Sequence, residues 1–148
     1  MIHSFFEKSV VVLKPQSLAT SATATGNIDT KNCRQVTLDV MLDSAGAVSS
    51  NPPTLKISES ADTVTTNFAD ITAFVGDGVG GFTIPDADTA SPQIIRFNID
   101  TKNRKRYLKL TLTPAGATQL VGAVARLGRK EQTPITASGL GVAALVSG

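Results

Sequence analysis

Short runs of alternating apolar and polar residues, separated by turn-forming residues, dominate the chain. Every second residue from Val36 to Leu42 is aliphatic, and Leu108, Leu110 and Leu112 repeat the pattern near the other end. A period of two places such side chains on one face of a β-strand. No ten-residue stretch keeps a 3.6-residue period with helix caps. The pattern therefore predicts an all-β protein.

Turn residues divide this pattern into short strands. We expect strands at 10–13, 19–25, 34–42, 54–59, 71–75, 82–84, 92–99, 107–113 and 117–127. Pro15 ends the first of them, and the last is the longest, with Val121, Ala123, Ala125 and Leu127 facing inward. Residues 61–70 are the one segment suited to a short helical turn. Strands of this number and spacing favour an antiparallel β-sandwich of jelly-roll or Greek-key type.

The hexapeptide Asn-Ile-Asp-Thr-Lys-Asn occurs twice, at 27–32 and at 98–103. A strand-like run follows each copy, so we expect a polar turn and then a half-buried strand at two related corners of one closed architecture. Asp29 and Asp100 are expected to accept hydrogen bonds from the backbone of their own turns.

The end of the chain differs in composition from the rest. We predict one sandwich domain over residues 1–130 and an extended C-terminal arm over 131–148, because a charge-free run of small and aliphatic residues follows Pro134. An apolar arm of this kind suits contact with a neighbouring chain, for example as an added strand, better than solvation. Disorder is the alternative.

Composition argues against most catalytic chemistry. The net charge is +2, Cys33 is the one cysteine, His3 is the one histidine, and the chain has one tyrosine and no tryptophan. These counts exclude an internal disulfide framework and a site built from several thiolates, and they disfavour an aromatic stacking platform. No apolar run is long enough to span a bilayer, and the N-terminus lacks the basic region of a secretory signal. We predict a protein that is no enzyme, has no cofactor or metal, and is made in a cytoplasm.

Three weaker motifs have plainer explanations. The glycine-rich loop at 76–81 lacks the following helix of a phosphate cradle, so a hairpin is preferred. Acidic residues that invite a calcium or glycosidase interpretation lack the required spacing or placement. They are Asp77, Asp86 and Asp88 for calcium, with Asp39 and Asp43, or Glu59 and Asp62, as carboxylate pairs.

Basic residues gather in two places. Lys102, Arg104, Lys105 and Arg106 lie at and after the second hexapeptide, and Arg126, Arg129 and Lys130 close the last strand. Such clusters favour contact with an acidic partner, and nucleic acid is one such partner. Solvated turns explain them equally well.

The chain resembles the decoration, or cement, proteins that coat the capsids of tailed bacteriophages. The resemblance rests on Gln-Val-Thr-Leu-Asp-Val-Met-Leu-Asp-Ser at 35–44, Leu-Lys-Ile-Ser-Glu-Ser at 55–60, and Ala-Arg-Leu-Gly-Arg-Lys at 125–130. It implies a homotrimer at the three-fold and local three-fold positions of an icosahedral shell. The trimer would bind the major capsid protein on the virion surface and reinforce it, with no membrane, no direct nucleic acid and no catalytic residue.

The predicted partner contacts combine the basic clusters with the arm. They are Arg126, Arg129 and Lys130 first, then Lys102, Arg104, Lys105 and Arg106, with Leu140, Val142 and Leu145 from the arm. A non-catalytic carbohydrate-binding sandwich is the alternative function, although the lack of tryptophan weighs against it. A small carboxylate enzyme is the third.

Overall fold

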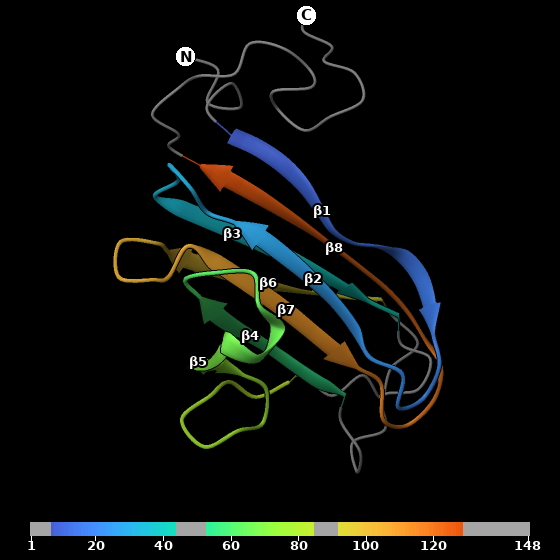
Figure 1. Cartoon of the computed structure of the whole chain (residues 1–148). Helices are drawn as coiled ribbons and strands as arrows, with labels where there is room; N and C mark the ends of the chain where they lie inside the picture. The colour runs from blue at the N-terminus through green and yellow to red at the C-terminus, as the bar shows by residue number, and fades with distance from the viewer. Residues whose placement is uncertain (1–6, 44–52, 85–91, 129–148) are drawn as a thin grey trace, which may run out of the picture.

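The computed structural model describes residues 7–43, 53–84 and 92–128. Eight strands and one 3-10 turn form in this part of the chain, and all strand pairs in the sheets are antiparallel. The elements are β1 (Glu7–Leu18), β2 (Ala24–Asp29), β3 (Gln35–Leu42), β4 (Thr54–Ser60), η2 (Thr65–Asn67), β5 (Ala69–Val75), β6 (Gln93–Asp100), β7 (Tyr107–Thr113) and β8 (Gln119–Gly128). They build two four-stranded sheets, which lie face to face (Figure 1).

The strand order is that of a jelly roll. One sheet runs β1-β8-β3-β6 and the other runs β2-β7-β4-β5. The pairs β1 with β8, β2 with β7, β3 with β6 and β4 with β5 are those of one long hairpin wrapped into a sandwich. The predicted β-sandwich is therefore confirmed, in its jelly-roll form.

The core lies between the inward faces of the two sheets. Val36, Leu38 and Val40 of β3 are fully buried, as are the three leucines of β7. The four residues of β8 that the alternation placed inward are also buried. Burying such aliphatic side chains drives the two sheets together, since each contributes about 1.5–3 kcal/mol.

The first strand does not end before Pro15, as the sequence pattern predicted. β1 is the longest strand, and it continues through Pro15 to Leu18. Its pairing with β8 shifts register between Val11 and Leu13 and again between Leu13 and Gln16. Proline lacks an N–H donor, but an irregular edge strand does not need one there. The prediction failed because edge strands tolerate what central strands do not.

Two other predicted strands differ from the structure: of 19–25 only Ala24 and Thr25 lie in β2, and 82–84 is no strand. Residues 19–23 form the turn before β2, where Ser21 has a positive φ of 65° and its N–H donates to Pro114 O at 2.8 Å. Residues 82–84 form no strand, and only an isolated bridge joins Phe82 to Gly76. The chain does reverse at 76–81, as expected, because Phe82 N–H donates to Val75 O. The short turn expected within 61–70 is η2.

Candidate partner-binding surface

Each hexapeptide copy contains the end of a strand as well as a turn. Asn27, Ile28 and Asp29 end β2, and the matching residues of the second copy end β6. The prediction that residues 27–29 belong to the turn is therefore wrong, whereas Asn98 and Ile99 lie in a strand, as the predicted strand at 92–99 had them. The chain crosses from one sheet to the other after each copy, so the two copies do occupy related corners.

Both aspartates fold back on their own turns as predicted. Asp29 Oδ1 accepts from the N–H of Lys31 at 3.0 Å, and Asp100 Oδ1 accepts from the N–H of Lys102 at 2.9 Å. An aspartate that bonds the backbone two residues ahead stabilises a tight turn. The same local chemistry therefore presents one lysine at the tip of each corner.

The two corners also brace each other. The N–H and hydroxyl of Thr30 donate to Arg106 O at 2.9 and 2.8 Å. In return, the N–H of Thr101 donates to Arg34 O at 3.1 Å, and its hydroxyl donates to Cys33 O. Each threonine thus bonds the segment that follows the other copy. This reciprocal contact fixes the two turns side by side.

The strand registers collect these corners at one end of the sandwich. The connections 30–34, 61–68 and 101–106 lie there, with the beginning of β1 and the end of β8. They carry six basic side chains and one acidic side chain. In the described residues, the connections at the opposite end carry two acidic side chains, Asp43 and Asp77, and no basic one. We call the first the basic end.

The predicted basic cluster after the second hexapeptide divides into two kinds of residue. Arg106 makes a two-pronged ion pair with Asp29 at 2.9 and 2.8 Å and lies 4.8 Å from the ring centre of Tyr107. Arg104 is 3.7 Å from Glu59 and lies over the ring of Phe74. These two arginines are therefore engaged within the fold.

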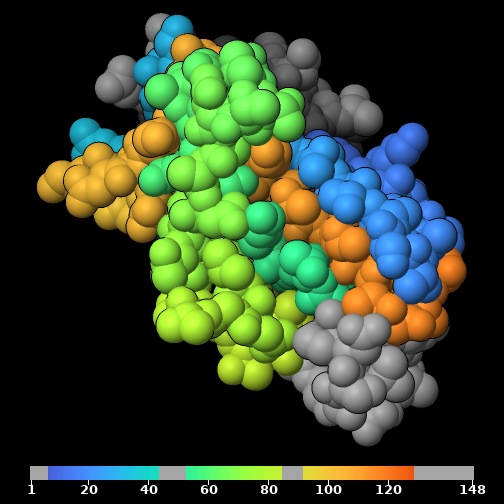
Figure 2. Space-filling model, turned by 60° about the horizontal axis from the view of Figure 1, so that its bottom comes forward, coloured from blue at the N-terminus to red at the C-terminus, as the bar shows by residue number. Residues whose placement is uncertain are grey.

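The remaining cations of the basic end are open. Lys31, Arg34, Lys102 and Lys105 are exposed, and none forms an ion pair within the part of the chain that the structure describes. Sequence reasoning singled out Lys102 and Lys105 but missed Lys31 and Arg34. The repeat itself held the signal for Lys31, because it occupies the position equivalent to Lys102. In Figure 2 the segment around residues 100–106, in gold, projects from the body.

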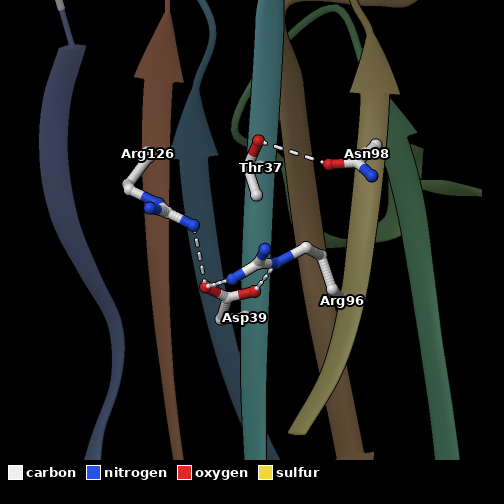
Figure 3. Close-up of polar contacts among 5 residues, drawn as sticks. All are labelled: Thr37, Asp39, Arg96, Asn98 and Arg126. Carbon is white, nitrogen blue, oxygen red and sulfur yellow. Dashed lines mark hydrogen bonds and ion pairs between the residues drawn. The ribbon is translucent and has the colours of Figure 1, made fainter. Parts of the chain in front are cut away.

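Arg126 lies away from these corners, on the outer face of the β1-β8-β3-β6 sheet. Its Nη2 donates to Asp39 Oδ2 at 3.2 Å, while Arg96 donates to the two oxygens of Asp39 at 2.6 and 3.0 Å (Figure 3). The hydrogen bond from Arg96 is the main cause that lowers the pKa of Asp39, against the opposing effect of burial. Asp39 is thus held ionised, unlike the acid of a glycosidase, whose pKa is raised.

Two further acidic candidates also have structural partners. Asp62 accepts from the N–H of Val64 at 3.0 Å and from the amide of Asn67 at 2.8 Å, and the bond from Asn67 is the main cause that lowers its pKa. Asp77 accepts from the N–H of Ile84 at 3.1 Å. No group of three metal-ligating side chains occurs among the described residues.

Several predicted contact residues lie outside the described residues. They are Arg129, Lys130, Leu140, Val142 and Leu145, together with Asp86 and Asp88 of the calcium alternative and the whole predicted arm. Gly128, where β8 ends, pairs with Gln35 and Glu7 at the basic end. In 7–43, 53–84 and 92–128 there is no helix with the length and apolar character needed to cross a bilayer.

A hollow in the surface adjoins the basic end. Backbone and side chains from the start of β3 and the end of β6 line it. The lining residues that the structure describes are Cys33, Arg34, Gln35, Asn98, Ile99, Asp100, Thr101 and Lys102. Two of the open cations, Arg34 and Lys102, therefore flank a concave surface.

Comparisons with known proteins find solved structures of similar shape but assign the chain to no family. No family model matches the chain, and no curated protein matches it. A chain of infectious bursal disease virus, Gx strain, aligns with a TM-score of 0.47 and 11% identity over 90% of this chain. A mutant VP2 protein of the same virus gives 0.46 and 16% over 90%.

Glycosidases give similar scores. A family GH115 4-O-methyl-alpha-glucuronidase aligns with a TM-score of 0.44 and 9% identity over 85% of this chain. The chain spans about a third of the length of the viral chains and under a fifth of the glucuronidase. These neighbours are viral capsid proteins and glycosidases, and at these scores neither likeness carries a functional conclusion.

Proposed function

We propose that this chain is a structural protein that binds the outside of a viral capsid and stabilises the shell, as the decoration proteins of tailed bacteriophages do. The basic end is the observation that carries the proposal. Four open cations from segments about 70 residues apart meet there on two braced turns. The proposed role is non-catalytic, and the proposed partner is the major capsid protein.

Rigid presentation of charge suits this role. The Asx hydrogen bonds and the Thr30 and Thr101 contacts hold the backbone under Lys31 and Lys102, so less loop freedom is lost when a partner binds. Complementary charge speeds encounter and fixes orientation more than it adds affinity. A shell repeats the same subunit surface many times, so several linked copies of this chain that engage the proposed acidic sites together would attach more strongly than one contact allows.

The experiment is co-sedimentation with DNA-filled capsids that lack this protein. The double variant Lys31→Glu/Lys102→Glu reverses both turn-tip charges, and we expect the affinity per site to fall about tenfold or more. Lys14→Glu is the matched control, because Lys14 is an exposed lysine of β1 away from the basic end, and it should bind nearly as the wild type does.

Three outcomes would count against the proposal. One is equal loss of binding in the control and the double variant, and another is unchanged binding in the double variant. The third concerns competition: if duplex DNA displaces the protein from the DNA-filled capsids as readily as added empty capsids do, nucleic acid is the partner.

A further inference from the structure

The free edge of β6 is the most regular edge in the sandwich. All eight of its residues pair with β3 without a register shift. The other edges are interrupted or covered: β1 has two register shifts and contains Pro15, β5 has a shift, and β2 lies against β1. Native sheets usually protect a regular edge, because it is a template for another strand. Within the described residues nothing pairs with this one.

The backbone groups at this edge can be assigned from the neighbouring ladder. Asp43 N–H donates to Leu120 O, so odd-numbered residues of β3 bond to β8 and even-numbered residues bond to β6. The same alternation along β6 directs the N–H and C=O groups of its even-numbered residues to the free edge. These residues are Ile94, Arg96, Asn98 and Asp100, and their side chains are exposed.

The charges along this edge are self-complementary. Arg96 and Asp100 lie symmetrically about Asn98. If a second, antiparallel β6 pairs with this edge around a two-fold axis at Asn98, Arg96 of each copy lies opposite Asp100 of the other. Two equivalent ion pairs result. A centre at Arg96 would oppose two arginines, and a centre at Asp100 would oppose two aspartates. Centres at Ile95 or Phe97 would set Arg96 opposite an uncharged residue, and a centre at Ile99 would set it opposite Lys102. Opposite charges across neighbouring strands stabilise pairing and like charges oppose it, so charge favours the Asn98 register over the others.

We propose that the β6 edge binds β6 of a second copy of this chain around a two-fold axis. The β1-β8-β3-β6 sheet of each copy then joins that of the other to form one sheet of eight strands. Arg96 can turn to the new acid because Arg126 also donates to Asp39 and keeps that carboxylate paired. In this register residues 96–100 of the two β6 strands lie opposite one another. This proposal is independent of capsid binding and concerns the purified protein alone.

Cysteine cross-linking tests the pairing directly. Two-fold symmetry sets Asn98 opposite itself, at a Cα separation of about 5.5 Å, which a disulfide can span. Asn98→Cys, with the buried Cys33 retained, should therefore form a covalent dimer under oxidised glutathione. Thr37→Cys is the matched control, because Thr37 lies beside Asn98 on the same face but one strand inward. Equal cross-linking of the two variants would overturn the proposal.

Charge exchange tests the register. Asp100→Arg should weaken dimerisation about tenfold, and Arg96→Asp/Asp100→Arg should restore it, because the second change rebuilds both pairs. Light scattering over a concentration series measures the mass, and thermal unfolding confirms that each variant is folded. If the double variant does not fold, the cysteine pair decides. A wild-type monomer, the trimer that the resemblance implies, or a dimer unaffected by Asp100→Arg would contradict the proposal.

Discussion

The two long sides of the sandwich are built differently. On one side β1 lies close against β2, where a Cβ on Gly26 would come within 2.1 Å of Val12 O. On the other side β5 and β6 do not approach as closely, and aromatic rings fill the space between the sheets. Phe97 packs edge to face on Phe74 and Phe82, at ring-centre distances of 5.8 and 5.2 Å.

This difference explains where an interface can form. Close backbone approach shields the β1 and β2 edges, and the register shifts of β1 disrupt its edge further. Where phenylalanine rings fill the space between the sheets, the backbones of β5 and β6 need not approach each other, so β6 keeps a straight, open edge. The core is sealed on both sides, and among the described strands β6 is the edge strand that has neither a register shift nor a closely packed covering strand.

The largest expected effect comes from removing an aromatic ring on the open side. Phe97 is 5% exposed and contacts both other rings, so Phe97→Ala leaves a cavity between the sheets. We expect a loss of about 3–5 kcal/mol in the free energy of unfolding. Urea denaturation measures it, with Phe82→Ala as a milder control because Phe82 is only partly buried. A loss under about 1 kcal/mol would show that the rings do not seal this side.

Substitution on the closed side should have the next largest effect. Gly26→Ala sets a methyl group against the backbone of Val12 and forces β1 away from β2, at a cost of about 1–3 kcal/mol. Gly122→Ala is the matched control, since the nearest atom to its added Cβ is the end of Met41 at 3.5 Å. Thermal unfolding compares the two. Equal stability would mean that the close approach is unimportant.

The smallest stability effect is expected at the ion cluster beside the open edge. Asp39→Asn leaves Arg96 and Arg126 without their shared carboxylate, and we expect a loss of about 1 kcal/mol near neutral pH. Asp70→Asn, which breaks the more exposed pair with Lys56, should lose less. Urea denaturation of both variants and the wild type gives the comparison. A greater loss at Asp70 would contradict the assigned importance of the cluster.

Acid titration sharpens the same point. Hydrogen bonds from arginines lower the pKa of Asp39 and of Asp29 below the ordinary 3.8. A carboxylate with a lowered folded pKa contributes stability that is complete above about pH 4 and is lost as the pH falls through the folded pKa. The wild type should therefore lose stability below about pH 4 more steeply than Asp39→Asn does. Identical acid profiles would contradict this.

The sequence predicted local chemistry well. Alternation identified the inward residues of β8, and the repeated hexapeptide identified the two Asx turns. The predicted strand at 19–25 ended too early, because asparagine and aspartate are typical turn residues, while pairing with β7 continues β2 through residues 27–29. The end of β6 differed from the prediction by one residue, Asp100. The predicted strand end at Pro15 was wrong for a similar reason. A proline is tolerated inside β1 because β1 is an edge strand, and only the assembled sheet defines which strands are edges.

The surface chemistry was harder to predict. Charge alone grouped Arg106 with Lys102, but the fold pairs Arg106 with Asp29, 77 residues away, and leaves Lys102 open. Arg34 is held at the basic end by two backbone hydrogen bonds, from its N–H to Gly128 O and from the N–H of Thr101 to its own carbonyl. Such contacts depend on long-range topology, which a single sequence does not specify residue by residue. The order of strands in the sheets is of the same kind.

Cryo-electron microscopy of capsids incubated with the wild-type protein tests capsid binding most directly. The density of the bound sandwich should have its basic end, with the turns at 30–34 and 101–106, against the shell. An undecorated shell, or a sandwich seated through the opposite end that carries Asp43 and Asp77, would contradict the account.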